Sequence, residues 1–155
     1  MAATNGPCVF TASLSDAGVS IVARVTDGEH PATDLEKPWI CDSLEFYFDV
    51  NPYENLSEPT RGRRQLFVLS DGRLRAESGA IDLGDVRAEV RQDRTGYDVS
   101  LFVPWKALGT GPVRELGFDT LVNDVKADRS PVLRRAWTGS QQPHVNRFNW
   151  GCVVR

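Results

Sequence analysis

One stretch of alternating side chains, from Ser43 to Val50, constrains the fold of this chain most strongly. Apolar residues occupy every second position, and the positions between them hold polar or aromatic hydroxyl side chains. A period of two is that of a β-strand, in which successive side chains point to opposite faces of the sheet. We therefore expect a strand with one wholly apolar face in the core. The apolar set is Leu44, Phe46, Phe48 and Val50, and the other set is Ser43, Glu45, Tyr47 and Asp49.

The second face of this strand, with the loop before it, forms the first candidate site. Acidic residues are unfavourable in strands, so Glu45 and Asp49 need either solvent or a ligand. Trp39 lies six residues before Glu45, on the loop that leads into the strand. An indole plane beside polar groups suits a small polar ligand with one apolar side, such as a sugar. The alternative is an ordinary half-exposed strand with a buried Trp39 at its start.

Length and composition indicate one ordinary globular domain. The 155 residues suffice for a single core, and 41% hydrophobic and 25% charged residues are usual values for globular proteins. A net charge of −3 without a basic stripe argues against nucleic acid as a partner. The sequence has no apolar window long enough for a membrane span, and residues 1–7 lack the features of a signal peptide. We expect a tail at residues 1–7 and one domain at residues 8–155, with no nucleic-acid or membrane partner.

About nine short strand patterns follow one another at hairpin spacing. Residues 8–14 and 19–25 flank a turn, and Asp71-Gly72 supplies the positive φ of another hairpin. The one plausible helical turn is 104–109, with proline at its start and glycine at its end. The pattern predicts an all-β fold, a β-sandwich of two antiparallel sheets of jelly-roll or immunoglobulin-like type, with less than about one-tenth helix.

The three cysteines do not have the spacing of a metal site. Cys8 and Cys152 lie in the first and last strand patterns of the predicted sandwich. Because chain ends of a domain often come close, we expect these two to be neighbours and Cys41 to stay a free thiol.

The residues give no support for catalysis. His30 and His144 lie in polar loops without a recognisable serine or cysteine elbow. Glu45 and Asp49 are four apart on one strand, hence about 13 Å apart, which is wider than the carboxyl separation in glycoside hydrolysis. We expect Asn123 and Asp124 to brace a loop by backbone hydrogen bonds rather than to bind a metal.

Four fragments of the chain together resemble the family 9 carbohydrate-binding modules and their relatives, which are β-sandwiches. The resemblance covers about residues 8–155, and the order of all four fragments is more specific than any one of them. The fragments are Pro38-Trp39 with 42–49 (DSLEFYFD), 96–105 (GYDVSLFVPW), 116–124 (LGFDTLVND), and Arg135-Ala136-Trp137 followed by Trp150-Gly151.

In that family a sugar is held between two aromatic planes while acid, amide and guanidinium groups bond its hydroxyls. The resemblance places the first plane on Trp39, the acid on Glu45 and the amide on Gln65. The second plane falls near His144, and Gln141 joins the predicted binding set. We expect the other tryptophans to belong to the core; they are Trp105, Trp137 and Trp150.

The sequence departs from the family pattern at several points. Phe67 stands where the family has an arginine, and His144 stands where it has a tryptophan, whose ring offers more stacking area. The family's opening strand and its calcium-linked acidic loop have no counterpart here, because this chain starts late. The resemblance implies Ca²⁺ as the metal to consider, but it assigns no residue to it.

The sequence therefore predicts a non-catalytic carbohydrate-binding domain, with a mono- or oligosaccharide or a polysaccharide end as partner. We expect it to be an accessory module joined to other domains of a larger extracellular or periplasmic protein, such as a glycoside hydrolase. The main alternative is a structural or interaction domain that kept the sandwich and lost sugar binding. A third is a hydrolase with acids from separate strands, which turnover of aryl glycosides would reveal.

Overall fold

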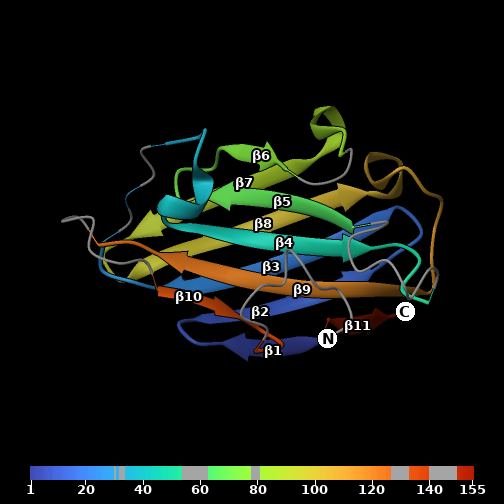
Figure 1. Cartoon of the computed structure of the whole chain (residues 1–155), viewed down its shortest axis with the longest axis horizontal. Helices are drawn as coiled ribbons and strands as arrows, with labels where there is room; N and C mark the ends of the chain where they lie inside the picture. Colours follow the sequence, from blue (N-terminus) through green and yellow to red (C-terminus); the bar gives the residue numbers. More distant parts are fainter. Residues whose placement is uncertain (30, 32–33, 54–62, 78–80, 127–132, 140–149) are drawn as a thin grey trace.

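The structure, a computed structural model, describes residues 1–29, 31, 34–53, 63–77, 81–126, 133–139 and 150–155. These residues form two antiparallel sheets that face each other, with the six-stranded sheet in front in Figure 1. In order across the five-stranded sheet lie β1 (Ala2–Asn5), β2 (Cys8–Leu14), β3 (Gly18–Thr26), β8 (Gly96–Pro104) and β7 (Arg87–Asp93). In order across the six-stranded sheet lie β10 (Leu133–Ala136), β9 (Glu115–Asp124), β4 (Ser43–Asp49), β5 (Arg63–Leu69) and β6 (Leu74–Ala76), and β11 (Gly151–Val154) also pairs with β9. The predicted β-sandwich is confirmed.

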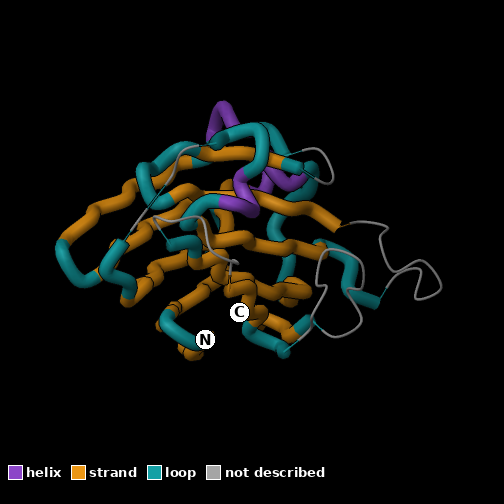
Figure 2. The backbone as a smooth tube through the Cα atoms, turned by 60° about the vertical axis from the view of Figure 1, so that its left-hand side comes forward, coloured by secondary structure: helices purple, strands orange, loops and turns teal. Residues whose placement is uncertain are grey.

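Helix is confined to short 3₁₀ turns in the described part of the chain (Figure 2). They are η1 (Pro38–Ile40), η2 (Leu83–Asp85) and η3 (Trp105–Leu108). The turn predicted at 104–109 is η3, which follows Pro104 and ends at Gly109 with a left-handed φ of 68°. Within the described residues, the search for a helix long and apolar enough to cross a membrane found none.

The core lies between the inner faces of the two sheets. Phe118 of β9 stands at its centre, with its ring centroid 5.9, 6.4 and 5.8 Å from those of Phe10, Phe46 and Phe48. Phe10 belongs to the five-stranded sheet and the other three to the six-stranded sheet, so this aromatic cluster joins both layers.

The tryptophans predicted for the core take different places. Trp105 is 3% exposed and donates its indole N–H to the carbonyl of Ser15 at 2.9 Å, which satisfies its one polar group. Trp137 is half-buried and packs edge-on against Phe10 in the core. Trp150 instead packs against Tyr47, on the face of the six-stranded sheet that points away from the core.

Strand β4 is buried on both faces, so the alternative of an ordinary half-exposed strand is wrong. It lies between β5 and β9, and its apolar side chains pack in the core as predicted. Its other face is also shielded from solvent, with Glu45 0%, Tyr47 0% and Asp49 2% exposed. The two acids therefore depend on protein partners rather than on water.

One segment differs from its predicted structure, and one pair of residues differs from its predicted role. Residues 1–7, expected to be a tail, contain β1, which pairs with β2 after a turn at Gly6 with φ 57°. An edge strand that reads Ala-Ala-Thr-Asn shows no apolar alternation, so the pattern does not reveal it. Asn123 and Asp124, expected to brace a loop by backbone hydrogen bonds, end β9, and the side chain of Asn123 bonds Ser43 and Glu45.

The expected approach of Cys8 and Cys152 does not produce a disulfide, and all three cysteines are free thiols. Cys8 faces the core from β2, and burial raises its pKa to about 12. Cys152 is exposed, because on β11 its neighbour Val153 takes the inward position. The two thiols thus point into different environments although both strands lie near the chain ends.

Candidate functional site

A polar network centred on Glu45 occupies the outer face of the six-stranded sheet. One carboxylate oxygen, Oε1, accepts hydrogen bonds from Asn123 Nδ2 at 2.8 Å and from Arg134 Nη2 at 2.9 Å. The other, Oε2, accepts from Gln65 Nε2 at 3.0 Å and from the hydroxyl of Tyr47. These donors come from β4, β5, β9 and β10, so four adjacent strands meet at one buried carboxylate.

The register of the sheet brings these donors together. Gln65 lies opposite Tyr47, and Asn123 lies opposite Ser43 on one side and Arg134 on the other. Asn123 also accepts a hydrogen bond from Arg134 Nε at 3.0 Å and donates one to Ser43 Oγ at 3.0 Å. The amide and the guanidinium are therefore fixed in position before any ligand arrives.

Electrostatics keep the network in one protonation pattern. Burial, followed by the negative charge of Glu45, raises the pKa of Tyr47 far above its usual range, so the phenol stays protonated and donates. The ion pair between Arg134 and Glu45 is asymmetric, because the Arg134 side chain is 40% exposed and that of Glu45 is 0% exposed. Arg134 thus presents part of its guanidinium to solvent while a buried anion holds it.

Two apolar clusters stand on either side of Glu45. The register places Phe67 on one side of it and Leu121 on the other. The first cluster contains Cys41, Phe67 and Leu69 with Leu35 against it, and the second contains Tyr47, Leu121 and Ala136 with Trp150 against it. These side chains lower the local dielectric, which strengthens the hydrogen bonds to Glu45.

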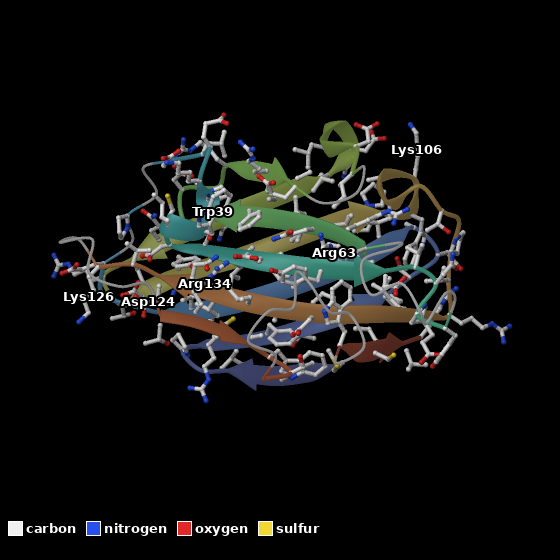
Figure 3. All side chains as sticks on the ribbon, in the orientation of Figure 1. Trp39, Arg63, Lys106, Asp124, Lys126 and Arg134 are labelled. Carbon is white, nitrogen blue, oxygen red and sulfur yellow. The ribbon has the colours of Figure 1, made fainter. Side chains whose placement is uncertain are left out.

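Trp39, Arg134 and Arg63 lie over this same face of the sheet (Figure 3). Trp39 is on η1 and is 37% exposed, so part of the indole is open to solvent. Arg63, in β5, is half-buried, and burial lowers its pKa, although an arginine stays charged at neutral pH. An exposed aromatic plane and the fixed guanidinium of Arg134 are therefore available to a ligand here.

The structure locates three of the five sequence-predicted binding residues. Trp39 has the partial exposure that a stacking platform needs. Glu45 is fully buried and Gln65 is 6% exposed, and the two bond each other rather than solvent. Gln141 and His144 lie outside the described residues.

Two members of the network, Asn123 and Arg134, were not predicted from the sequence. The guanidinium that Phe67 lacks is supplied from another strand, by Arg134 of β10. Phe67 itself is 1% exposed and belongs to an apolar cluster. The nearest sequence signal was the fragment Arg135-Ala136-Trp137, and it does not reveal which strands lie beside β4.

Another aromatic–acid pair lies away from this network. A hollow of about 610 Å³ is lined by Val50, Asn51, Pro52, Tyr53 and Glu115. Tyr53 is 69% exposed and donates a hydrogen bond to Glu115, which raises its pKa to about 12. This hollow adjoins the end of β4 opposite to η1, so a ligand there would contact different strands from one at Trp39.

The network predicts a large difference between two glutamates. Glu45→Ala removes the shared acceptor and leaves its buried donors unpaired, so it should lower the free energy of unfolding by about 3–5 kcal/mol. Glu89→Ala is the control, because Glu89 lies exposed on β7 and pairs with Arg91 of the same strand; it should change stability by at most about 0.5 kcal/mol. Urea unfolding measures both. A loss below about 1 kcal/mol for Glu45→Ala would contradict the central place of this carboxylate.

Comparison with known proteins gives a family and a fold. A family model described as carbohydrate family 9 binding domain-like matches residues 10–154. A family 9 carbohydrate-binding module from Caldicellulosiruptor kristjanssonii in complex with glucose superposes with a TM-score of 0.79 at 18% identity, covering 95% of this chain and 75% of that one. A structure of such a module in complex with cellotriose, from the same organism, gives 0.78 at 17% identity, covering 95% and 73%. No curated protein matches the sequence.

Proposed function

The chain belongs to the carbohydrate family 9 binding domain-like family, and on this basis we propose that it binds carbohydrate without catalysis on the outer face of the six-stranded sheet. The observation that carries the proposal is the exposed indole of Trp39 over the same face as the Arg134 guanidinium. The similar modules solved with glucose and with cellotriose support the class of ligand.

Each residue has a distinct role in this proposal. Trp39 stacks on the apolar face of a pyranose ring. Arg134 donates hydrogen bonds to sugar hydroxyls from a guanidinium that Glu45 and Asn123 hold in place. Glu45 acts as a positioning residue rather than a direct contact, because protein donors already occupy both of its oxygens. For the other side of the sugar, Gln141 and His144 remain a proposal from the sequence.

The expected affinity is modest. Each sugar hydroxyl leaves water before it bonds to the protein, and the net gain per hydrogen bond is only about 1 kcal/mol. Stacking on a single partly exposed indole adds the apolar contribution. We expect dissociation constants of about 0.1–10 mM, or about −3 to −5 kcal/mol, for simple sugars.

The acids of β4 support a binding role over a hydrolytic one. Glu45 and Asp49 are buried, and Glu45 is saturated by protein donors, so this pair does not face an open cleft. Assays with aryl glycosides test for turnover, and we expect none. We further propose that the domain serves as a module beside other domains of a larger extracellular or periplasmic protein.

One observation favours a second candidate function, a structural or interaction domain without sugar binding. The buried network around Glu45 stabilises the sheet without any ligand, and Phe67 fills the position of the family's arginine with an apolar side chain. Titration with sugars separates the two functions.

Sugar binding should depend on Trp39. Calorimetric titration with glucose, cellobiose and cellotriose should show millimolar binding to the wild type and none to Trp39→Ala, because the stacking surface is gone. Ile40→Ala is the matched control, since Ile40 is also exposed, at 44%, on the same turn; it should bind as the wild type does. If the wild type binds no sugar at about 20 mM, or if Trp39→Ala binds unchanged, the proposed site is wrong.

Two neighbouring arginines should differ in their effect on the same titration. Arg134→Gln removes a charged donor at the site and should weaken binding about ten-fold or more, since hydrogen bonds to charged groups contribute about 1.5–3 kcal/mol. Arg135→Gln is the control, because Arg135 points to the other face of β10, toward Gly6. Thermal unfolding of both variants confirms that they are folded. Equal affinities for the two variants would remove Arg134 from the site.

A further inference from the structure

The hollow at the end of β4 opposite to η1 has an aromatic side chain that is exposed and yet fixed in place. Tyr53 is 69% exposed, and its hydroxyl donates a hydrogen bond to Oε1 of Glu115, which lies 62 positions later in the chain. Tyr53 belongs to none of the three hydrophobic clusters of the described residues, so packing in the core does not explain it. A fixed, exposed ring offers a ligand a stacking surface without the cost of ordering it first.

The sheet sets the position of this ring, because residue 117 has no side chain. Asp49, the last residue of β4, lies opposite Gly117 of β9. A Cβ at Gly117 would lie 3.1 Å from the Cβ of Asp49 and 3.3 Å from that of Pro52. The glycine therefore lets Pro52 approach β9 closely, and the next residue, Tyr53, reaches Glu115 at the start of that strand.

Glu115 brings a negative charge to the hollow. It is half-buried and forms no ion pair with any described residue. Its neighbour Arg114 is exposed and does not line the hollow. The hydrogen bond to Glu115 is the main cause that raises the pKa of Tyr53 to about 12. Burial, followed by Glu115 and with a smaller contribution from Asp49, also raises the pKa of Cys152. The hollow therefore favours a positively charged group over a neutral one.

The lining suits a small organic cation better than a metal ion. Among the described lining residues only Glu115 carries a carboxylate, whereas Ca²⁺ takes six to eight oxygen ligands. An ammonium group is attracted both by a carboxylate and by the face of an aromatic ring. The volume of about 610 Å³ lies in the usual range for small-molecule sites and has room for a ring. Asn51 adds an amide to the lining, which suits a ligand that also carries hydroxyls.

We propose that this hollow is a second ligand site, which binds an amino sugar through its protonated amine. The amine pairs with Glu115, and the apolar face of the sugar ring stacks on Tyr53. The choice of a sugar rests on the proposed carbohydrate function, but the hollow lies at the other end of β4 from Trp39 and shares no lining residue with that site. Neutral sugars such as glucose and cellobiose lack the ammonium group, so they should leave the hollow empty at about 20 mM.

The test is an NMR titration of the whole ¹⁵N-labelled chain with glucosamine at pH about 6, where an amine with a pKa near 8 is protonated. The backbone amides of Asn51, Tyr53 and Glu115 should shift with a dissociation constant of about 1–10 mM. N-acetylglucosamine is the matched neutral ligand, and it should bind these residues at least ten-fold more weakly, because it cannot form the charge-assisted hydrogen bond.

Two variants locate the amine and the ring. Glu115→Gln keeps an acceptor for the Tyr53 hydroxyl but removes the charge, so it should weaken glucosamine binding at the hollow at least ten-fold. Tyr53→Ala removes the stacking surface and should weaken it to a similar extent. Glu89→Gln is the control, since Glu89 is exposed on β7 of the other sheet, and it should bind as the wild type does. Thermal unfolding shows whether each variant is folded.

The Trp39→Ala variant separates this proposal from the proposed function. It removes the first sugar site, and glucosamine should still shift the amides at the hollow with unchanged affinity. A wild type that binds glucosamine at the hollow but no cellobiose would refute the site at Trp39 alone.

The proposal for the hollow is overturned if glucosamine at about 50 mM shifts none of these amides, or if N-acetylglucosamine binds there equally well. It also fails if Glu115→Gln binds glucosamine with unchanged affinity. Binding of Nα-acetyl-lysine as tight as that of glucosamine would mean that the hollow recognises an ammonium group without the sugar ring, which contradicts the assignment to an amino sugar.

Discussion

A carboxylate in the middle strand of a sheet that is covered on both faces must find its hydrogen-bond partners within the protein. Glu45 finds them on its own strand and on three others. A buried donor or acceptor left without a hydrogen bond there would cost more free energy than a typical surface contact contributes. The network therefore fixes the relative register of β10, β9, β4 and β5. A slip of one residue would turn Glu45 into the core and an apolar side chain outward, so packing and hydrogen bonding select the same arrangement.

The same constraint gives the outer face the two kinds of contact that the proposed sugar site needs. Arg134 bridges the buried anion and the solvent, and Trp39 provides an open apolar plane over the same sheet. A sugar needs both kinds of contact, because its ring faces are apolar and its hydroxyls are polar.

The sequence could predict the features that depend on residues close together in the chain, but not those that depend on residues far apart. The inner face of β4, the turn at Pro104 and the two-sheet fold arise from local patterns, and the structure confirms them. The burial of Glu45 and its contact with Arg134 depend on which strands are neighbours in the sheet. The alternation of side chains within one strand carries no information about that order. Position-by-position comparison with the family pattern therefore suggested that Phe67 had removed the guanidinium. Arg134, 67 positions later in the chain, supplies one.

The most direct test of sugar binding at this face is a two-dimensional ¹H–¹⁵N NMR titration of the uniformly labelled chain with cellobiose. The account predicts saturable shifts at the indole N–H of Trp39, at the guanidinium of Arg134, at amides of β4, β5, β9 and β10, and at the proposed contacts Gln141 and His144. Shifts centred on Tyr53 and Glu115 would move the site to the other end of β4. Shifts on the five-stranded sheet, or none at about 20 mM sugar, would contradict the account.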